Sequence, residues 1–201
     1  KRNLYMIIVL TAEQPVRHEQ HIINLLFENG LNMLHIRKCR FTDEEMKKYI
    51  GTIDAMHRER LALHSHHYLA AGMGIKHLHF REKDRMNNKY SGLQNDYRLS
   101  TSVHTVEDFN ALGAEWTYAF LSPVFASISK RGYGMEKNVL DDLKHKNNPN
   151  VQLIGLGGID ENNFQKAYAA GADGIALLGG IWQSGDPVNS FIQCSRKGLL
   201  F

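Results

Sequence analysis

Short apolar runs alternate with amphipathic segments along the whole chain. Eight of these runs have the length and the content of branched and aromatic residues that buried strands have. They span residues 5–10, 33–37, 61–65, 76–80, 99–103, 116–121, 152–156 and 174–178. The segments between them predict helices over residues 19–28, 43–58, 106–112, 161–170 and 187–196. Strands that alternate regularly with helices predict a parallel sheet covered by helices.

Two of the predicted helices begin with residues that suit a helix start. Thr42 is followed three residues later by Glu45, and Thr105 by Asp108. A threonine hydroxyl can accept from a free amide of the first turn, and an acid there suits the positive end of the helix. We therefore expect N-caps at both threonines.

Eight strand–helix units can form an open doubly wound sheet or a closed (β/α)₈ barrel. The number of units favours the barrel, also called a TIM barrel. With 201 residues it is of minimal size, and we expect some of its helices to be reduced to a turn. The weakest unit lies between residues 69 and 76. Because no linker or low-complexity tract interrupts the pattern, we expect residues 1–201 to form one domain.

Composition excludes several classes of protein. The net charge of +3 is too small to indicate a nucleic-acid surface, although a basic excess suits a small anionic ligand. No apolar run approaches the roughly 18 residues of a membrane span. The two cysteines, Cys39 and Cys194, lie far apart and form no metal-binding pattern. We therefore expect a cytoplasmic protein that binds neither nucleic acid nor membrane.

Glycine pairs follow the last two predicted strands. Gly157 and Gly158 end the run at 152–156, and Gly179 and Gly180 end the run at 174–178. In a barrel, the loops after the seventh and eighth strands often bind phosphate through backbone amides, because glycine lets an anion approach closely. The alternative is that these glycines only make tight turns.

Polar side chains lie in the second predicted strand. His35 and Arg37 are two residues apart, so they face the same side. At the end of a barrel strand, Arg37 could bind a phosphate. A buried arginine needs an anionic partner. The alternative partner is therefore a carboxylate of this chain, Glu82 or Asp84.

Hydroxyl-bearing and basic residues follow the fifth and sixth predicted strands. Ser102 lies in the sequence SVHT, and Lys130 lies in the long segment LSPVFASISKRGYG. Hydroxyls and a lysine ammonium can bind phosphate oxygens and stabilise a leaving anion. This segment could therefore cover an anion, or it could be an ordinary solvated loop.

Histidines cluster around the third and fourth predicted strands. They are His64, His66, His67, His77 and His79. By alternation, His64 shares a face with His66, and His77 shares one with His79. Imidazoles at this spacing on neighbouring strands could hold Zn²⁺ or another divalent metal, or they could make ordinary hydrogen bonds.

Taken together, these segments resemble the family of thiamine phosphate synthase and its thiazole tautomerase relatives. The resemblance rests on VLTAEQ, LHIRK, KHLHF, SVHT, SPVFASISK, LGGI and AGADGIALLGGI, in this order along nearly the whole chain. It implies a (β/α)₈ barrel. It also implies a reaction in which hydroxymethylpyrimidine diphosphate joins a thiazole phosphate and releases pyrophosphate with the help of Mg²⁺.

The resemblance implies a diphosphate and metal half that has diverged. The family's Gln, Arg and Lys of the second strand fall on His35, Arg37 and Cys39. Its Asn–Asp pair falls on Ser65 and His66, so one metal-binding Asp is absent. A second metal-binding Asp, counted five residues from His77, falls on Glu82, which could still bind Mg²⁺.

The other implied positions agree better with the family. Ser102 matches its serine, Ser127 and Ser129 replace two loop threonines, and Lys130 matches its diphosphate-binding lysine. Gly158 and Gly180 match its thiazole phosphate site.

Three functions stay open from the sequence. The first is a synthase with an altered metal site. The second is an isomerase or lyase that acts on a phosphorylated small molecule. The third is a non-catalytic protein that binds thiazole phosphate or thiamine phosphate. In each case we expect phosphorylated heterocycles as partners, and a homo-oligomer stays open.

Overall fold

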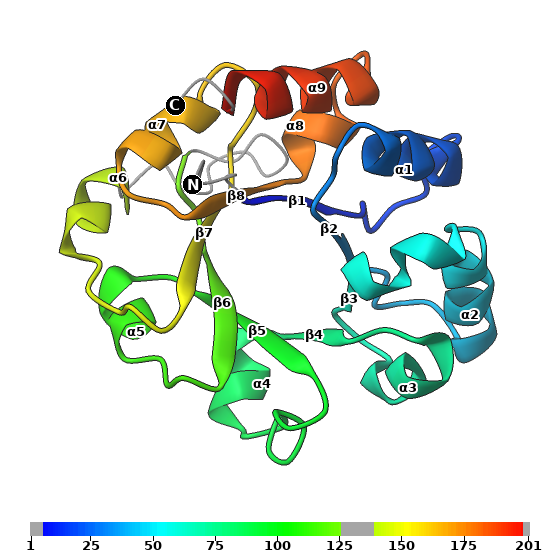
Figure 1. Ribbon diagram of the computed structural model, residues 1–201, viewed down its shortest axis with the longest axis horizontal. Coiled ribbons are helices and arrows are strands. Elements are labelled where there is room, and N and C mark those ends of the chain that lie inside the picture. The colour runs from blue at the N-terminus through cyan, green and yellow to red at the C-terminus, as the bar shows by residue number, and fades with distance from the viewer. Residues whose placement is uncertain (1–5, 126–138, 199–201) are drawn as a thin grey trace.

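The computed structural model describes residues 6–125 and 139–198. Within these residues, eight parallel strands form one closed ring in chain order, and β8 pairs with β1. Helices surround the ring, which Figure 1 shows from one end. The expected (β/α)₈ barrel is therefore confirmed. The strands are β1 (Met6–Leu10), β2 (Met33–Ile36), β3 (Leu61–Leu63), β4 (His77–Phe80), β5 (Arg98–Val103), β6 (Trp116–Leu121), β7 (Gln152–Leu156) and β8 (Gly174–Leu177).

Alternate strand residues fill the inside of the ring. The interior apolar cluster contains Ile8, Leu10, Met33, Ala62, Tyr118, Phe120, Ile154 and Ala176. A second and larger cluster lies between the ring and the helices, and it includes Val9, Leu34, Leu78 and Phe109. The strands are therefore buried on both faces, which explains why their sequences read as continuous apolar runs.

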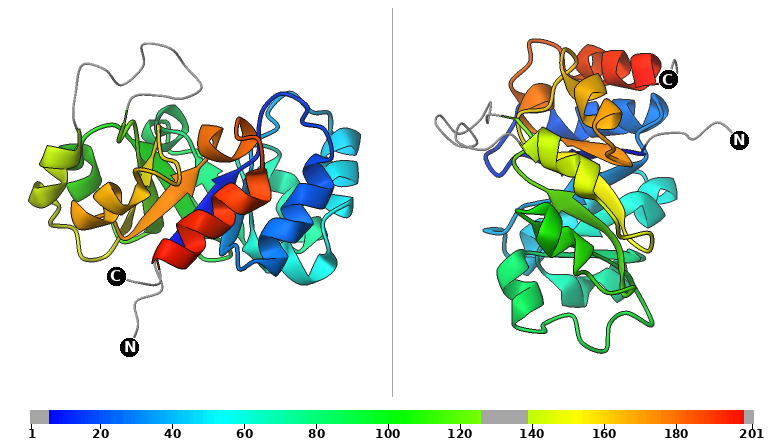
Figure 2. Two further views of the ribbon diagram at one scale, coloured as in Figure 1. Left: turned by 90° about the horizontal axis from the view of Figure 1, so that it is seen from above. Right: turned by 90° about the vertical axis from the view of Figure 1, so that its left-hand side faces the viewer.

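Most units of the barrel cover the ring with one short helix. The helices are α1 (Glu19–Glu28), α2 (Asp43–Gly51), α3 (Ala70–Met73), α4 (Glu82–Met86), α5 (Val106–Asn110), α6 (Val139–Asp142), α7 (Phe164–Ala169), α8 (Gly179–Trp182) and α9 (Pro187–Gly198). In Figures 1 and 2, α9 lies beside α1, so the last helix packs next to the first where the ring closes. None of the described helices is long and apolar enough to cross a membrane.

Both expected N-caps are confirmed. The Thr42 side chain accepts from the amide of Glu45, and the Glu45 side chain accepts from the amide of Thr42. Thr105 accepts from the amide of Asp108. Helix α1 has the expected bounds, and α3 is the expected single turn between residues 69 and 76.

Three helix expectations need correction. The helix expected over 43–58 ends at Gly51, because the chain becomes extended at Asp54 before a 3₁₀ helix over Ala55–Arg60. Helix α7 begins at Phe164 rather than at residue 161, because the side chains of Asp160 and Asn163 hold a turn there. Helices α4, α6 and α8 were not expected.

Candidate active site

A cavity of about 290 Å³ opens at the carboxyl ends of the strands. Every strand contributes to it close to its last residue. In parallel barrels, this is the end at which active sites lie. The lining residues are Leu10, Arg37, Cys39, His64, His79, Arg81, Ser102, Phe120, Ser122, Leu156, Gly157, Gly158, Ile159, Ala176, Leu178 and Gly179.

The turn after β7 presents backbone amides to this cavity. Gly157 and Gly158 have positive φ angles of 99° and 65°, which side-chain-bearing residues rarely adopt. Among the described residues, no backbone carbonyl accepts from either amide. A Cβ on Gly157 would lie 3.0 Å from the Cα of Pro123. Both glycines line the cavity, and their amides have no backbone acceptor within the part of the chain that the structure describes.

The turn after β8 packs against the turn after β7. A Cβ on Gly180 would lie only 2.5 Å from the carbonyl oxygen of Ile159. Gly180 is buried and does not line the cavity, whereas Gly179 does. Three of the four expected glycines thus line the cavity, and Gly180 lets the two turns approach each other.

Two guanidinium groups lie at the opposite side of the mouth, near β2 and β4. Arg37 follows β2, and its Nε lies 3.9 Å from a carboxylate oxygen of Glu13. The alternative partners expected for Arg37, Glu82 and Asp84, make ion pairs with other residues. Arg81 follows β4 and also lines the cavity. Sequence reasoning missed Arg81, although its spacing of two from His79 placed both on one side of the strand.

Three histidines meet at the floor of the cavity. His35, His64 and His79 each offer one ring nitrogen, and these three nitrogens all lie within 4.8 Å of one another. Nδ1 of His35 lies 2.8 Å from Nε2 of His64. The rings of His64 and His79 are stacked, with centroids 4.1 Å apart.

Hydroxyl groups contact nitrogens of two of these rings. Nε2 of His35 lies 2.6 Å from the hydroxyl of Tyr118. Nδ1 and Nε2 of His79 lie 2.9 Å and 3.0 Å from the hydroxyls of Ser100 and Ser102. His35 is fully buried beneath the floor, so it contacts these neighbours and does not line the cavity as an expected substrate-binding residue would. His64 takes that place.

Burial keeps the three imidazoles neutral. Burial is the main cause of the lowered pKa of His79, which is about 3. Burial, followed by the neighbouring histidines, lowers the pKa values of His35 and His64 well below their ordinary value. At neutral pH the floor of the cavity therefore carries uncharged nitrogen groups.

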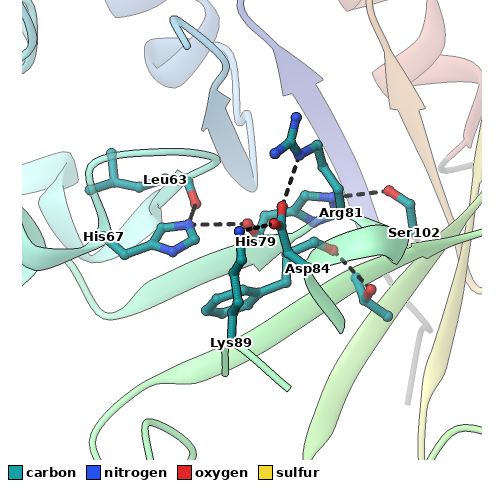
Figure 3. Close-up of polar contacts among 9 residues, drawn as sticks. Leu63, His67, His79, Arg81, Asp84, Lys89 and Ser102 are labelled. Atoms are coloured by element: carbon teal, nitrogen blue, oxygen red, sulfur yellow. Dashed lines mark hydrogen bonds and ion pairs between the residues drawn. The ribbon is translucent and has the colours of Figure 1, made fainter. Parts of the chain in front are cut away.

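The other histidines of the expected cluster lie elsewhere. His66 has a positive φ of 54° just beyond the end of β3, so alternation fails there. Its Nε2 lies 2.9 Å from the carbonyl oxygen of Phe41. Nε2 of His67 lies 3.1 Å from the carbonyl oxygens of Leu63 and His79 (Figure 3). His77 lines a different depression, with Lys76 and Arg98 at the amino ends of the strands.

The two expected Mg²⁺ ligands have separate partners, and neither lines the cavity. His66 lies 3.7 Å from Asp43, and Glu82 lies 3.6 Å from Arg85. The count that led to Glu82 began at His77, but the β4 histidine at the cavity is His79. Five residues after His79 comes Asp84, which lies between Arg81 and Lys89 (Figure 3). Its carboxylate accepts from Nε of Arg81 at 2.8 Å and from Nζ of Lys89 at 2.7 Å.

The structure describes some of the remaining expected residues. Ser102 lines the cavity and contacts His79. The hydroxyl of Ser65 lies 2.9 Å from Nδ1 of His66 and does not line the cavity. Ser127, Ser129 and Lys130 lie outside the described residues.

Comparison with known proteins agrees with this fold. The model of the TMP-TENI family, described as thiamine monophosphate synthase, matches residues 4–181. A thiamine-phosphate synthase of Clostridium tetani (strain Massachusetts / E88) is 26% identical over 190 residues, which cover 88% of each chain.

Two solved structures are similar in fold. A thiamine phosphate pyrophosphorylase from Bacteroides thetaiotaomicron has a TM-score of 0.78 and 24% identity, and the match covers 97% of each chain. Another, from Pyrococcus furiosus, has a TM-score of 0.79 and 18% identity, and the match covers 99% of this chain and 97% of the other. At these identities, the two structures support the barrel architecture alone.

Proposed function

The chain belongs to the thiamine monophosphate synthase family, and from this membership we propose that it is a transferase that makes thiamine phosphate. The reaction joins hydroxymethylpyrimidine diphosphate to thiazole phosphate. The bond between the pyrimidine methylene carbon and the diphosphate oxygen breaks, and pyrophosphate leaves with the electron pair. The thiazole nitrogen then forms the new bond to that carbon.

The distribution of anion-binding groups around the cavity carries this proposal. Arg37 and Arg81 lie beyond β2 and β4, whereas the amides of Gly157 and Gly158 lie beyond β7. In a ring of eight strands, β3 and β7 are opposite each other. The cavity therefore offers two separate places for anions, as two phosphorylated substrates require.

Apolar side chains lie between these two places. Leu10, Phe120, Leu156 and Leu178 line the cavity. A flat heterocycle can pack against such a surface while its phosphate is bound at the edge. We therefore place the thiazole phosphate at the glycine turns and the pyrimidine diphosphate beside Arg37, with Arg81 as an additional cation.

Two expected catalytic groups complete the proposal. Ser102 can donate to a diphosphate oxygen, and its hydroxyl already contacts His79 at the cavity floor. Lys130, which lies outside the described residues, is proposed to stabilise the negative charge that develops on the departing pyrophosphate. Ser127 and Ser129 are proposed to bind the same diphosphate. Ser65 contacts His66 and is proposed to act on the substrate only through the position of its loop.

The described residues do not fit the Mg²⁺ that the family uses. Mg²⁺ prefers carboxylate and water oxygens. Among the described residues that line the cavity, none carries a carboxylate. His66 and Glu82 are both engaged outside the cavity. We therefore derive no step through Mg²⁺, and its requirement becomes a variable of the assay.

A coupled assay with both thiamine precursors tests the proposal. We expect pyrophosphate release only when both substrates are present, and formation of thiamine phosphate in equal amount, measured with and without added Mg²⁺. Lys130→Ala should lower kcat roughly 100-fold or more, because its charge acts on the leaving group. Lys144→Ala, at an exposed lysine, is the matched control. Release of pyrophosphate without product, or none at all, contradicts the transferase.

The lack of carboxylates among the described residues that line the cavity favours one second function, a non-catalytic protein that binds thiazole phosphate or thiamine phosphate. In that case, either ligand alone should raise the melting temperature while no turnover occurs. Thermal unfolding with each ligand, run beside the coupled assay, separates the two functions.

A further inference from the structure

We propose that His35, His64 and His79 form a binding site for one Zn²⁺ ion at the floor of the cavity. The three rings come from neighbouring parts of the ring: β2, the residue after β3, and β4. This site differs from the expected set of histidines, because it includes His35 and leaves out His66, His67 and His77. It lies in the same cavity as the proposed transferase site, but its test does not depend on that activity.

The spacing of the nitrogens is close to what Zn²⁺ requires. With Zn–N distances of about 2.05 Å, two nitrogens in a tetrahedral site lie about 3.3 Å apart. The three ring nitrogens lie within 4.8 Å of one another, and the His35–His64 pair is at 2.8 Å. To bind one ion, the side chains must rotate so that the close pair opens, the wider pairs close, and the stacked rings of His64 and His79 turn their ring planes toward a common point.

The hydrogen bonds around His35 direct a lone pair into the site. The Tyr118 hydroxyl donates to Sδ of Met33, at 2.9 Å. In the His35 tautomer that has its hydrogen on Nε2, this nitrogen donates to the Tyr118 hydroxyl. Nδ1 of His35 is then the nitrogen without a hydrogen, and it points to His64. It is therefore available as a metal ligand.

The same reasoning applies to His79. In the His79 tautomer that has its hydrogen on Nδ1, this nitrogen donates to the Ser100 hydroxyl, which can itself donate to the carbonyl oxygen of Leu78. Nε2 of His79 then carries a lone pair, which accepts from Ser102. When His64 moves its hydrogen to Nδ1, its Nε2 becomes the third ligand. Outer hydrogen bonds of this kind orient the imidazoles of known metal sites.

The surroundings favour a neutral-ligand site that is open on one side. Zn²⁺ binds imidazole through a ring nitrogen that carries no hydrogen, and each of the three rings offers one nitrogen to the shared space. His64 and His79 also line the cavity, so a fourth coordination position would face the space where a small molecule binds. Three protein ligands with one open position is the arrangement of catalytic zinc sites.

Metal analysis of the full chain, prepared without a histidine tag, tests the site. After treatment with a chelator, one equivalent of Zn²⁺ is added, and the protein is washed and its zinc content measured. We expect about one Zn²⁺ per chain, retained in millimolar Mg²⁺ because Mg²⁺ is a poor match for imidazole. With Co²⁺ instead, we expect the intense visible absorption of a four- or five-coordinate site.

Variants identify the ligands. His64→Asn and His79→Asn should each reduce the zinc content to near zero. His21→Asn, at an exposed histidine of α1, should not change it. His66→Asn separates the proposed set from the expected one and should also retain the metal.

Three results would overturn the site. The first is an unmodified chain that retains no zinc, which leaves a hydrogen-bonded imidazole cluster only. The second is zinc that persists in both His64→Asn and His79→Asn. The third comes from X-ray absorption at the zinc edge of the unmodified chain, which also decides if the variants do not fold. Fewer than three imidazole nitrogens at about 2.0 Å from the zinc would overturn the site. Because no substrate is used, a failed transferase assay does not affect this test.

Discussion

The two sides of the barrel mouth recognise polar groups in different ways. On the side of β7 and β8, the glycine side, Gly157, Gly158 and Gly179 line the mouth without side chains, and Gly180 lets the two turns approach each other. On the side of β2, β3 and β4, the histidine side, buried polar side chains fill the interior and satisfy one another.

This difference has an energetic consequence. A glycine turn needs room, so any added atom disturbs it. A cluster of buried polar groups needs partners, so any removed atom leaves another group without one. The glycine side should therefore be sensitive to added side chains and the histidine side to lost partners, and substitutions on the two sides test this contrast.

The largest loss of stability is expected where a buried charge loses its partner on the histidine side. Lys38, just after β2, is buried and makes an ion pair of 2.8 Å with the buried Glu19. Lys38→Met leaves the buried Glu19 without its cation and should cost about 3–5 kcal/mol of unfolding free energy. Urea denaturation measures it.

The double variant with Glu19→Leu is the control for this pair. Because it removes both charges, it should recover most of the loss. A double variant that is no more stable than Lys38→Met would show that packing, and not the unpaired charge, is responsible.

On the glycine side, an added methyl group should cost less. The Cβ of Gly180→Ala would lie 2.5 Å from the carbonyl oxygen of Ile159, so the two turns must separate, at about 2 kcal/mol. Gly72→Ala, in α3 with nothing within 4 Å of the new Cβ, should be neutral or slightly stabilising. If the two variants are equally stable to heat, the close approach of the two turns does not make Gly180 necessary.

The glycine side should also lose its ligand selectively. Gly158→Val places a branched residue at a φ of 65° beside the amides of this turn, and thiazole phosphate should bind about 100-fold more weakly. Isothermal calorimetry measures the affinity, and circular dichroism checks that the variant folds. If Gly158→Val folds and binds as tightly as the parent, phosphate does not bind at this turn.

The smallest effect is expected from an ion-paired carboxylate beside the histidine side. Burial alone would raise the pKa of Asp84, but hydrogen bonds from Arg81 and Lys89 outweigh it and leave the pKa lowered. The folded chain therefore binds this proton less readily than the unfolded chain. The resulting stability is present above the ordinary pKa of 3.8 and is lost as pH falls through the lowered value.

Asp84→Asn should accordingly cost about 1 kcal/mol near pH 7, because two ion pairs are lost. The difference from the parent should shrink as pH falls below 4. Thermal unfolding across this range measures it, and a difference that stays constant at low pH would contradict the assignment. Asp96→Asn, at an exposed aspartate, is the control.

The sequence predicted the barrel well and the site unevenly. The strands agree with their apolar runs to within about two residues, because a strand that is buried on both faces must be apolar throughout. Helix bounds were less reliable after Gly51 and before Phe164, where side chains and turns compete with the helix.

Candidate residues could be predicted where their position follows from one strand. The glycines after β7 and β8 and Ser102 lie at strand ends, and Gly157, Gly158, Gly179 and Ser102 all line the cavity. Arg81 could have been found by the same alternation. His66 could not be placed this way, because the strand ends at Leu63 and the backbone turns before it.

The sequence by itself determined the order of the units, the inward and outward faces of the strands and the glycine turns, because all three are set by residues close together in the chain. Only the tertiary structure decided that His35, His64 and His79 meet, that Arg37 lies beside Glu13, and that no described carboxylate lines the cavity. Those contacts depend on the register between strands and on where each strand ends. A shift of one residue would turn a side chain to the other face, so composition and spacing alone do not settle them.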